Sequence, residues 1–234
     1  MPTHALTEPN APPVSTPLHG KLLNIFVSPG EVFEEVVASP STPVTWLVPT
    51  VFVCLTAMIS LLVAPLQRGA EAEVRQLSDT DAIVSSDTAK LSNRLILAAA
   101  LTVTASAIAG TVWSAFVLWF MGRMLLKTRF SFWKTMEVVG LTGMILALGA
   151  IVTSLLIAAT GDPAARPALS IFLGQSNPGH KLHSGLAAMN FFHLWAATVL
   201  GVGLSKLARV SFSEAAFWVF GYWVALGFAM ICLA

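Results

Sequence analysis

Two histidines, His180 and His183, stand three residues apart, a spacing that could place two zinc ligands on one turn. A structural zinc site takes four ligands, and no cysteine, third histidine or acidic residue stands nearby to complete it. The preceding Asn177-Pro178-Gly179 is typical of a turn. We therefore predict no metal site and no cofactor.

A third histidine, His193, is a candidate for proton or ligand binding, because ionisable residues at membrane depth are usually functional. It stands two residues before Trp195 at the edge of an apolar stretch. Anchoring of both rings at the membrane surface is the plainer interpretation.

Glu137 and Glu214 also border apolar stretches, close in sequence to Lys134 and Lys206. Paired carboxylates could mark an ion path, but interfacial ion pairs are the more common outcome. No serine–histidine–aspartate arrangement and no glycine-rich phosphate loop occurs in the chain. We therefore predict no catalytic residue and a protein that is not an enzyme.

The composition points to a membrane as the solvent of this chain. Of its 234 residues, 56% are hydrophobic and 11% are charged, with a formal net charge of +1. An ordinary soluble domain carries about 25% charged residues. This composition excludes a disordered chain and a nucleic-acid-binding protein, so the predicted partner is the lipid bilayer.

Five stretches contain no charged residue, and each has the about 20 residues that a membrane-spanning helix needs. A helix satisfies its own backbone hydrogen bonds in hydrocarbon. The sequence therefore predicts an all-α polytopic membrane protein with a bundle of five transmembrane helices. The expected spans are 46–66, 95–121, 138–160, 186–205 and 215–234.

The distribution of basic residues predicts the orientation. Lysines and arginines gather in two short loops, 122–137 and 206–214, which lie on the same side as the N-terminus. Short basic loops are retained in the cytoplasm. We expect a cytoplasmic N-terminus and an outer C-terminus, with the proline-rich residues 1–20 forming a disordered cytoplasmic tail ahead of a membrane domain over 21–234.

A short amphipathic helix is predicted before the first span, in the segment KLLNIFVSPGEVFEEVVASP over 21–40. Ser28 and Glu31 have the spacing of a capping box, and Pro29 would occupy the first helical position. Phe33 falls on the apolar face of this helix. Ser28, Pro29, Glu31 and Phe33 are therefore candidates either for contact with a partner or for packing on the bundle.

Small residues recur every four positions along the fourth span, at Ala197, Gly201 and Ser205. Such a stripe lets another helix approach closely. Gly201 and the neighbouring Gly203 are candidate packing residues. Packing within the chain is the plain interpretation, and homo-oligomerisation is the alternative.

Three motifs give the chain a family resemblance. Phe26, Pro29, Phe33 and Pro40 match an F-x-x-P-x-x-x-F helix and a following proline, which precede the first span in bacterial members of the Yip family. FSFWKTMEVVGLTGM, over Phe130–Met144, resembles the family's basic and aromatic start of the third span. FFHLWAATVLGVGLSKLARVSFSEAAFWV, over Phe191–Val219, resembles its closing pattern, with matches at Trp195, Gly203, Leu204, Ser213 and Ala215.

The resemblance covers about residues 22–234 and implies a multi-span membrane protein of the bacterial inner membrane. The eukaryotic branch interacts with Ypt/Rab GTPases, but its Asp-Leu-Tyr-Gly motif has no counterpart here. The leading expectation is a non-enzymatic scaffold or adaptor in membrane organisation or trafficking, whose protein partners bind the N-terminal face. The alternative is a small channel or transporter for an ion or small solute. A lipid-modifying enzyme is a third hypothesis, for which no catalytic set is present.

Overall fold

The computed structural model describes residues 16–76, 86–161, 165–167 and 190–233, with only the backbone described for 61–76, 86–96 and 229–233. Most of the predicted tail, and both His180 and His183, lie outside these residues. The described chain is helical and contains no strand, as the sequence predicted. Its helices are α1 (Leu18–Asn24), α2 (Pro29–Ala38), α3 (Pro43–Gln76), α4 (Ser86–Met124), α5 (Phe132–Thr160), α7 (Phe191–Ala208) and α8 (Phe212–Leu233).

Four helical stretches are long and apolar enough to cross a membrane. They are Pro43–Ser60 in α3, Leu97–Met124 in α4, Phe132–Thr160 in α5 and Phe191–Ala208 in α7. The apolar part of α8 whose side chains are described, Phe212–Phe228, is shorter. The described residues are therefore all-helical, with four helices able to span a membrane, and the fifth span stays a prediction.

The helix at the expected fourth span, 186–205, is α7, which runs from Phe191 to Ala208, while residues 186–189 lie outside the described residues. Asn190 begins the helix because its side-chain oxygen accepts a hydrogen bond from the backbone N–H of Phe192, at 2.9 Å. Arg209 ends it in the left-handed conformation, with φ 57°. Absence of charge thus located the span, whereas capping chemistry set its ends.

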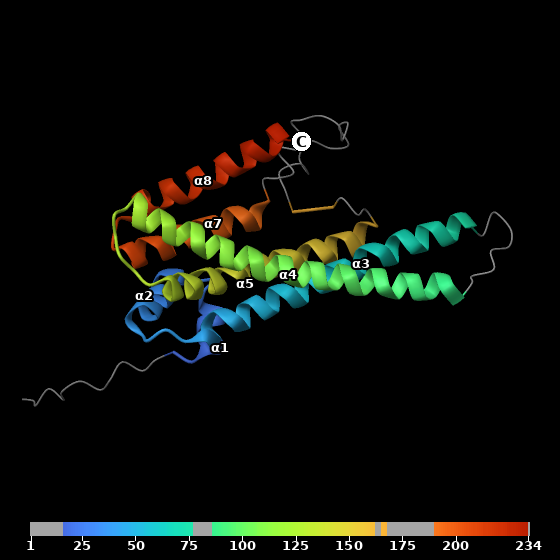
Figure 1. The fold of residues 1–234 in the computed structure, drawn as a ribbon, viewed down its shortest axis with the longest axis horizontal. Helices are drawn as coiled ribbons and strands as arrows, with labels where there is room; N and C mark the ends of the chain where they lie inside the picture. Colours follow the sequence, from blue (N-terminus) through green and yellow to red (C-terminus); the bar gives the residue numbers. More distant parts are fainter. Residues whose placement is uncertain (1–15, 77–85, 162–164, 168–189, 234) are drawn as a thin grey trace, which may run out of the picture.

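Helix α5 is the centre of the bundle. It packs against α3, α4 and α7 and also contacts α1 and α2, while α8 packs against α7. Figure 1 shows the long helices running roughly along one axis, with α1 and α2 gathered at one end. Glycine makes the closest approach possible: a Cβ on Gly140 of α5 would lie 2.6 Å from the Cα of Trp46 in α3.

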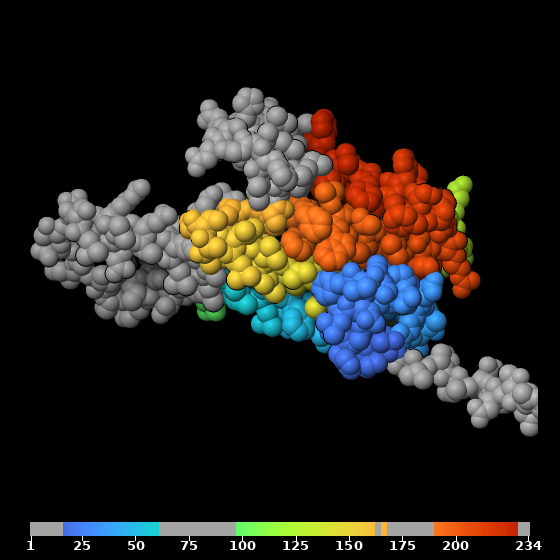
Figure 2. All heavy atoms as spheres, turned by 180° about the vertical axis from the view of Figure 1, so that it is seen from behind, coloured from blue at the N-terminus to red at the C-terminus, as the bar shows by residue number. Residues whose placement is uncertain are grey.

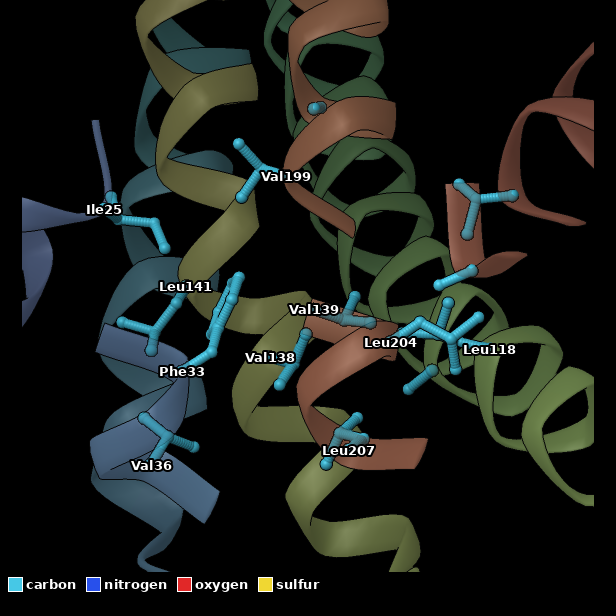
Figure 3. Close-up of a cluster of buried hydrophobic side chains, with 14 of the residues drawn as sticks. Ile25, Phe33, Val36, Leu118, Val138, Val139, Leu141, Val199, Leu204 and Leu207 are labelled. Carbon is cyan, nitrogen blue, oxygen red and sulfur yellow. The ribbon is translucent and has the colours of Figure 1, made fainter. Parts of the chain in front are cut away.

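The hydrophobic core lies where α2, α5, α7 and α4 meet (Figure 3). Its largest fully buried side chains include Phe33, Leu141 and Leu204, which come from three different helices. Seen from behind, in Figure 2, the blue α1 and α2 lie against the yellow α5 and the orange α7. The short N-terminal helices are therefore part of the core rather than a separate appendage.

Candidate functional site at the docked amphipathic helix

Helix α2 begins where the sequence predicted, but without the expected capping box. Pro29 occupies the first helical position and Ser28 the N-cap. The side chain of Ser28 makes no capping hydrogen bond, and Glu31 is exposed. Ser28 has φ −129° and ψ 59°, outside the extended conformation that aims an N-cap oxygen at the helix. The first turn is instead started by Pro29, whose fixed φ suits a helix.

The apolar face of α2 is buried against α5 and α7. Phe33 is fully buried, and Val32 and Val36 are nearly so. The ring of Phe33 lies over Gly203 of α7 and beside Val138 of α5. A Cβ placed on Gly203 would meet both the Phe33 ring and the Val138 side chain. The structure thus brings together two candidate residues, Phe33 and Gly203, which the sequence had singled out for different reasons.

The charged face of α2 is held by two lysines from other elements. Lys206 of α7 donates a hydrogen bond to Glu34, and Lys21 of α1 lies 3.2 Å from Glu35. The backbone N–H of Thr16 also donates to Glu35, at 2.7 Å. Burial would by itself raise the pKa of the Glu35 carboxyl, but the hydrogen bonds from Thr16 and Lys21 lower this pKa below its ordinary value.

A buried ion pair joins the end of α2 to the start of α5. Lys134 Nζ lies 2.9 Å from Glu137 Oε2, and the side chain of Glu137 is only 3% exposed. Lys134 also donates to the carbonyl of Val36 at 2.5 Å, which satisfies one of the last carbonyls of α2. Glu137 Oε1 accepts from the backbone N–H of Thr42 at 2.5 Å. The pair therefore fixes the α2–α3 connection onto the bundle.

The ion pairs expected near the span ends form in one case and not in the other. Lys134 and Glu137 pair as expected. Glu214 is exposed and forms no ion pair with Lys206, which instead reaches Glu34 of α2. Sequence proximity suggested Glu214, whereas the docking of α2 places a different carboxylate beside the same lysine.

A pocket of about 370 Å³ lies next to this ion pair. Two indoles, the α2–α3 connection and the Glu137 carboxylate line it; the residues are Ser41, Thr42, Pro43, Trp46, Trp133 and Glu137. The buried Nε1 of Trp46 has no hydrogen-bond partner in the described part of the chain. Sequence reasoning did not find this pocket, although both tryptophans stand at span starts, where aromatic residues gather.

The remaining candidates lie apart from the pocket. His193 is exposed and occupies the first turn of α7. Among the described residues, no group of three His, Cys, Asp or Glu side chains is placed to hold a metal ion. Around the pocket, Glu137 accepts from Lys134 and from the backbone N–H of Thr42, an arrangement that can bind or position groups.

Gly201 lies at the contact between α7 and α8. A Cβ on Gly201 would lie 3.3 Å from the Cα of Ala216 and 3.4 Å from the ring of Phe212. Ala197 and Ser205, on the same stripe, are also buried. The small residues thus face a helix of the same chain at this position.

Comparison with known proteins gives one match. No curated protein and no solved structure matches the chain. The family model described as the Yip1 domain matches residues 23–234. The matched region includes the docked helix α2, the Lys134–Glu137 pair and all the apolar helices. The chain is therefore a membrane protein of the Yip family.

Proposed function

We propose that this protein is a non-enzymatic scaffold or adaptor in membrane organisation, with protein partners bound at its N-terminal face. One observation carries the proposal: α1 and α2 are fixed to the bundle through α5 and α7, yet leave apolar side chains uncovered. Leu23 is 66% exposed and Val27 is 85% exposed, and the acidic Glu31 follows them on α2. A rigid, partly apolar surface of this kind suits recognition of another protein.

The proposal includes a topology. We place α8 across the membrane as a fifth span, the N-terminal face in the cytoplasm and the C-terminal end outside, in a bacterial inner membrane. The exposed Arg123 in the last turn of α4 and the exposed Lys127 and Arg129 between α4 and α5 support this orientation, as does Arg209 between α7 and α8. Single cysteines test it with an impermeant thiol reagent in intact cells. Ser131→Cys should be shielded and Ser85→Cys should react; the reverse pattern contradicts the orientation.

Site-specific photo-crosslinking in native membranes tests the scaffold function. A photoreactive residue at Glu31 should give protein adducts of defined mass that recur between preparations. The matched control is Ile151 of α5, which is 43% exposed on a spanning helix and should contact lipid. Absence of protein adducts from Glu31, or the same adducts from both positions, would contradict an N-terminal partner surface.

The pocket beside Glu137 is the observation that favours the alternative, a small channel or transporter. Two features argue against a channel or transporter. The charge of Glu137 is already compensated by Lys134, and α5 continues from it into the bundle with fully buried apolar side chains such as Leu141 and Ile145. Flux assays in proteoliposomes distinguish the two functions. A scaffold should give no solute or ion flux above that of empty vesicles, whereas a channel or transporter should exceed it.

A further inference from the structure

The pocket at the start of α3 and α5 offers a carboxylate with spare acceptor positions and a buried donor without a partner among the described residues. A carboxylate has about four acceptor positions, and Glu137 uses one for the N–H of Thr42 and one for Lys134. The indole N–H of Trp46 is a buried donor without an acceptor in the described part of the chain. A buried donor left unsatisfied costs about 1–3 kcal/mol. A ligand that carries both a hydrogen-bond-donating cation and an accepting anion would complete both groups.

The charge of the pocket agrees with a ligand of zero net charge. Glu137 and Lys134 form a neutral pair 2.9 Å apart, so neither an isolated cation nor an isolated anion meets an uncompensated charge. A zwitterion can place its cation toward the carboxylate and its anion toward the indole N–H of Trp46. The indole faces of Trp46 and Trp133 add attraction for the cation, since aromatic rings carry negative potential on their faces.

A row of exposed apolar side chains follows the pocket residue Pro43 along α3. Val44 is 52% exposed beside the pocket residue Pro43, and Leu47, Val51, Leu55 and Ile59 follow at about one-turn spacing, each exposed by 48–56%. These side chains suit contact with acyl chains. A small soluble zwitterion would leave this row unused, whereas a phospholipid would occupy both parts.

We propose that this pocket binds the head group of a zwitterionic phospholipid, one with a primary ammonium and a phosphate. The ammonium lies between the two indoles and donates to Glu137. The phosphate accepts from the Trp46 indole, and the acyl chains follow the exposed row on α3.

Native mass spectrometry of the full chain in detergent tests the proposal. The probes are phosphatidylethanolamine and phosphatidylglycerol with identical acyl chains, added separately to delipidated protein. The dissociation constant for phosphatidylethanolamine should be lower by about threefold to thirtyfold, the range that one desolvated cation–π contact supplies. Equal affinity for the two lipids, or tighter binding of phosphatidylglycerol, would overturn the proposal.

Substitutions at Trp133 locate the preference. Trp133 is 59% exposed, so Trp133→Leu should fold while losing the aromatic face, and the preference should disappear. Trp113→Leu is the matched control, because Trp113 is 60% exposed on α4 and does not line the pocket; the preference should remain. Trp133→Phe keeps an aromatic ring and should retain part of the preference for phosphatidylethanolamine. A preference that survives Trp133→Leu unchanged would place the lipid elsewhere and reject this site.

Soluble phosphoethanolamine separates the two sources of the same head group. It lacks acyl chains and should not displace bound phosphatidylethanolamine at equal concentration. Displacement at equal concentration would show that the head group alone supplies the affinity, and would contradict a lipid ligand.

Discussion

Phe33 packs on the bare backbone of Gly203: a Cβ placed on Gly203 would lie 3.2 Å from Cε2 of the ring and 2.3 Å from Cγ1 of Val138. Because Gly203 carries no side chain, the Phe33 ring of α2 reaches the backbone of α7 there, beside Val138 of α5. Because Phe33 is fully buried there, the N-terminal helices and the spanning helices share one core. Stability of the bundle and docking of α2 should therefore be coupled.

Gly203→Ala should destabilise the protein by about 1–3 kcal/mol, as overpacking typically does. The new methyl group would meet both Val138 and Phe33, which are held by their own helices. Thermal unfolding in mild detergent measures the effect. Gly221→Ala in α8 is the matched control, because a Cβ there meets nothing within 4 Å. Equal unfolding midpoints for the two variants would show that α2 does not press on Gly203.

Phe33→Ala should cost about 3–5 kcal/mol, the usual loss for removing a buried aromatic ring. The cavity would open between α2 and α5, so the segment around α2 should also become sensitive to limited proteolysis. Leu23→Ala is the control, since Leu23 is 66% exposed and its truncation should change the unfolding midpoint little. If Phe33→Ala unfolds at the temperature of the unchanged protein, α2 does not contribute to the core.

The sequence predicted those features of the fold that depend on local composition. Long uncharged stretches located the apolar helices, because charge is costly in hydrocarbon wherever the helix lies. The positions of Phe33 and Glu34 on the helical period predicted which side of α2 is apolar, because this period alone determines the face on which each side chain lies. Neither inference required knowledge of a neighbouring helix.

The features that depend on contact between distant segments could not be predicted in this way. Lys206 was expected beside Glu214, its neighbour in sequence, but docking of α2 brings Glu34 to it instead. Ser28 and Glu31 have the spacing of a capping box, but the backbone at Ser28 takes a different conformation. The pocket combines two indoles from different helices with the α2–α3 connection, and no local pattern predicts that meeting.

Gly201→Leu should displace α8 from α7 and destabilise the protein by about 1–3 kcal/mol. Gly201 meets the backbone of Ala216, which cannot rotate away as a flexible side chain can. Gly110→Leu in α4 is the matched control for the exchange of glycine for leucine in a helix, because a Cβ at Gly110 meets nothing within 4 Å. Similar unfolding midpoints for both variants would mean that α8 is free to move away from Gly201.

Glu137→Gln should destabilise the protein by about 3–5 kcal/mol, because loss of one partner leaves the other charge of a buried pair uncompensated. The amide of Gln would offer one neutral oxygen to two donors, Lys134 and the N–H of Thr42, in place of two charged oxygens. Glu214→Gln is the control, since Glu214 is exposed. Adding Lys134→Met to Glu137→Gln should recover part of the loss by removing the stranded charge; an additive double variant would contradict a coupled pair.

Protonation of Glu35 should weaken the attachment of α1 and of Thr16 to α2. The pKa of Glu35 is lower in the folded protein than in the unfolded chain, where a glutamate titrates near pH 4.3. Its contribution to stability is therefore complete above the unfolded pKa and is lost as the pH falls through the lower, folded pKa. Glu35→Gln mimics the protonated side chain. The difference in unfolding midpoint between the unchanged protein and Glu35→Gln should be largest near pH 7 and should shrink toward zero at acidic pH. A difference that stays constant over this range would show that the charge of Glu35 does not hold Lys21 and Thr16 in place.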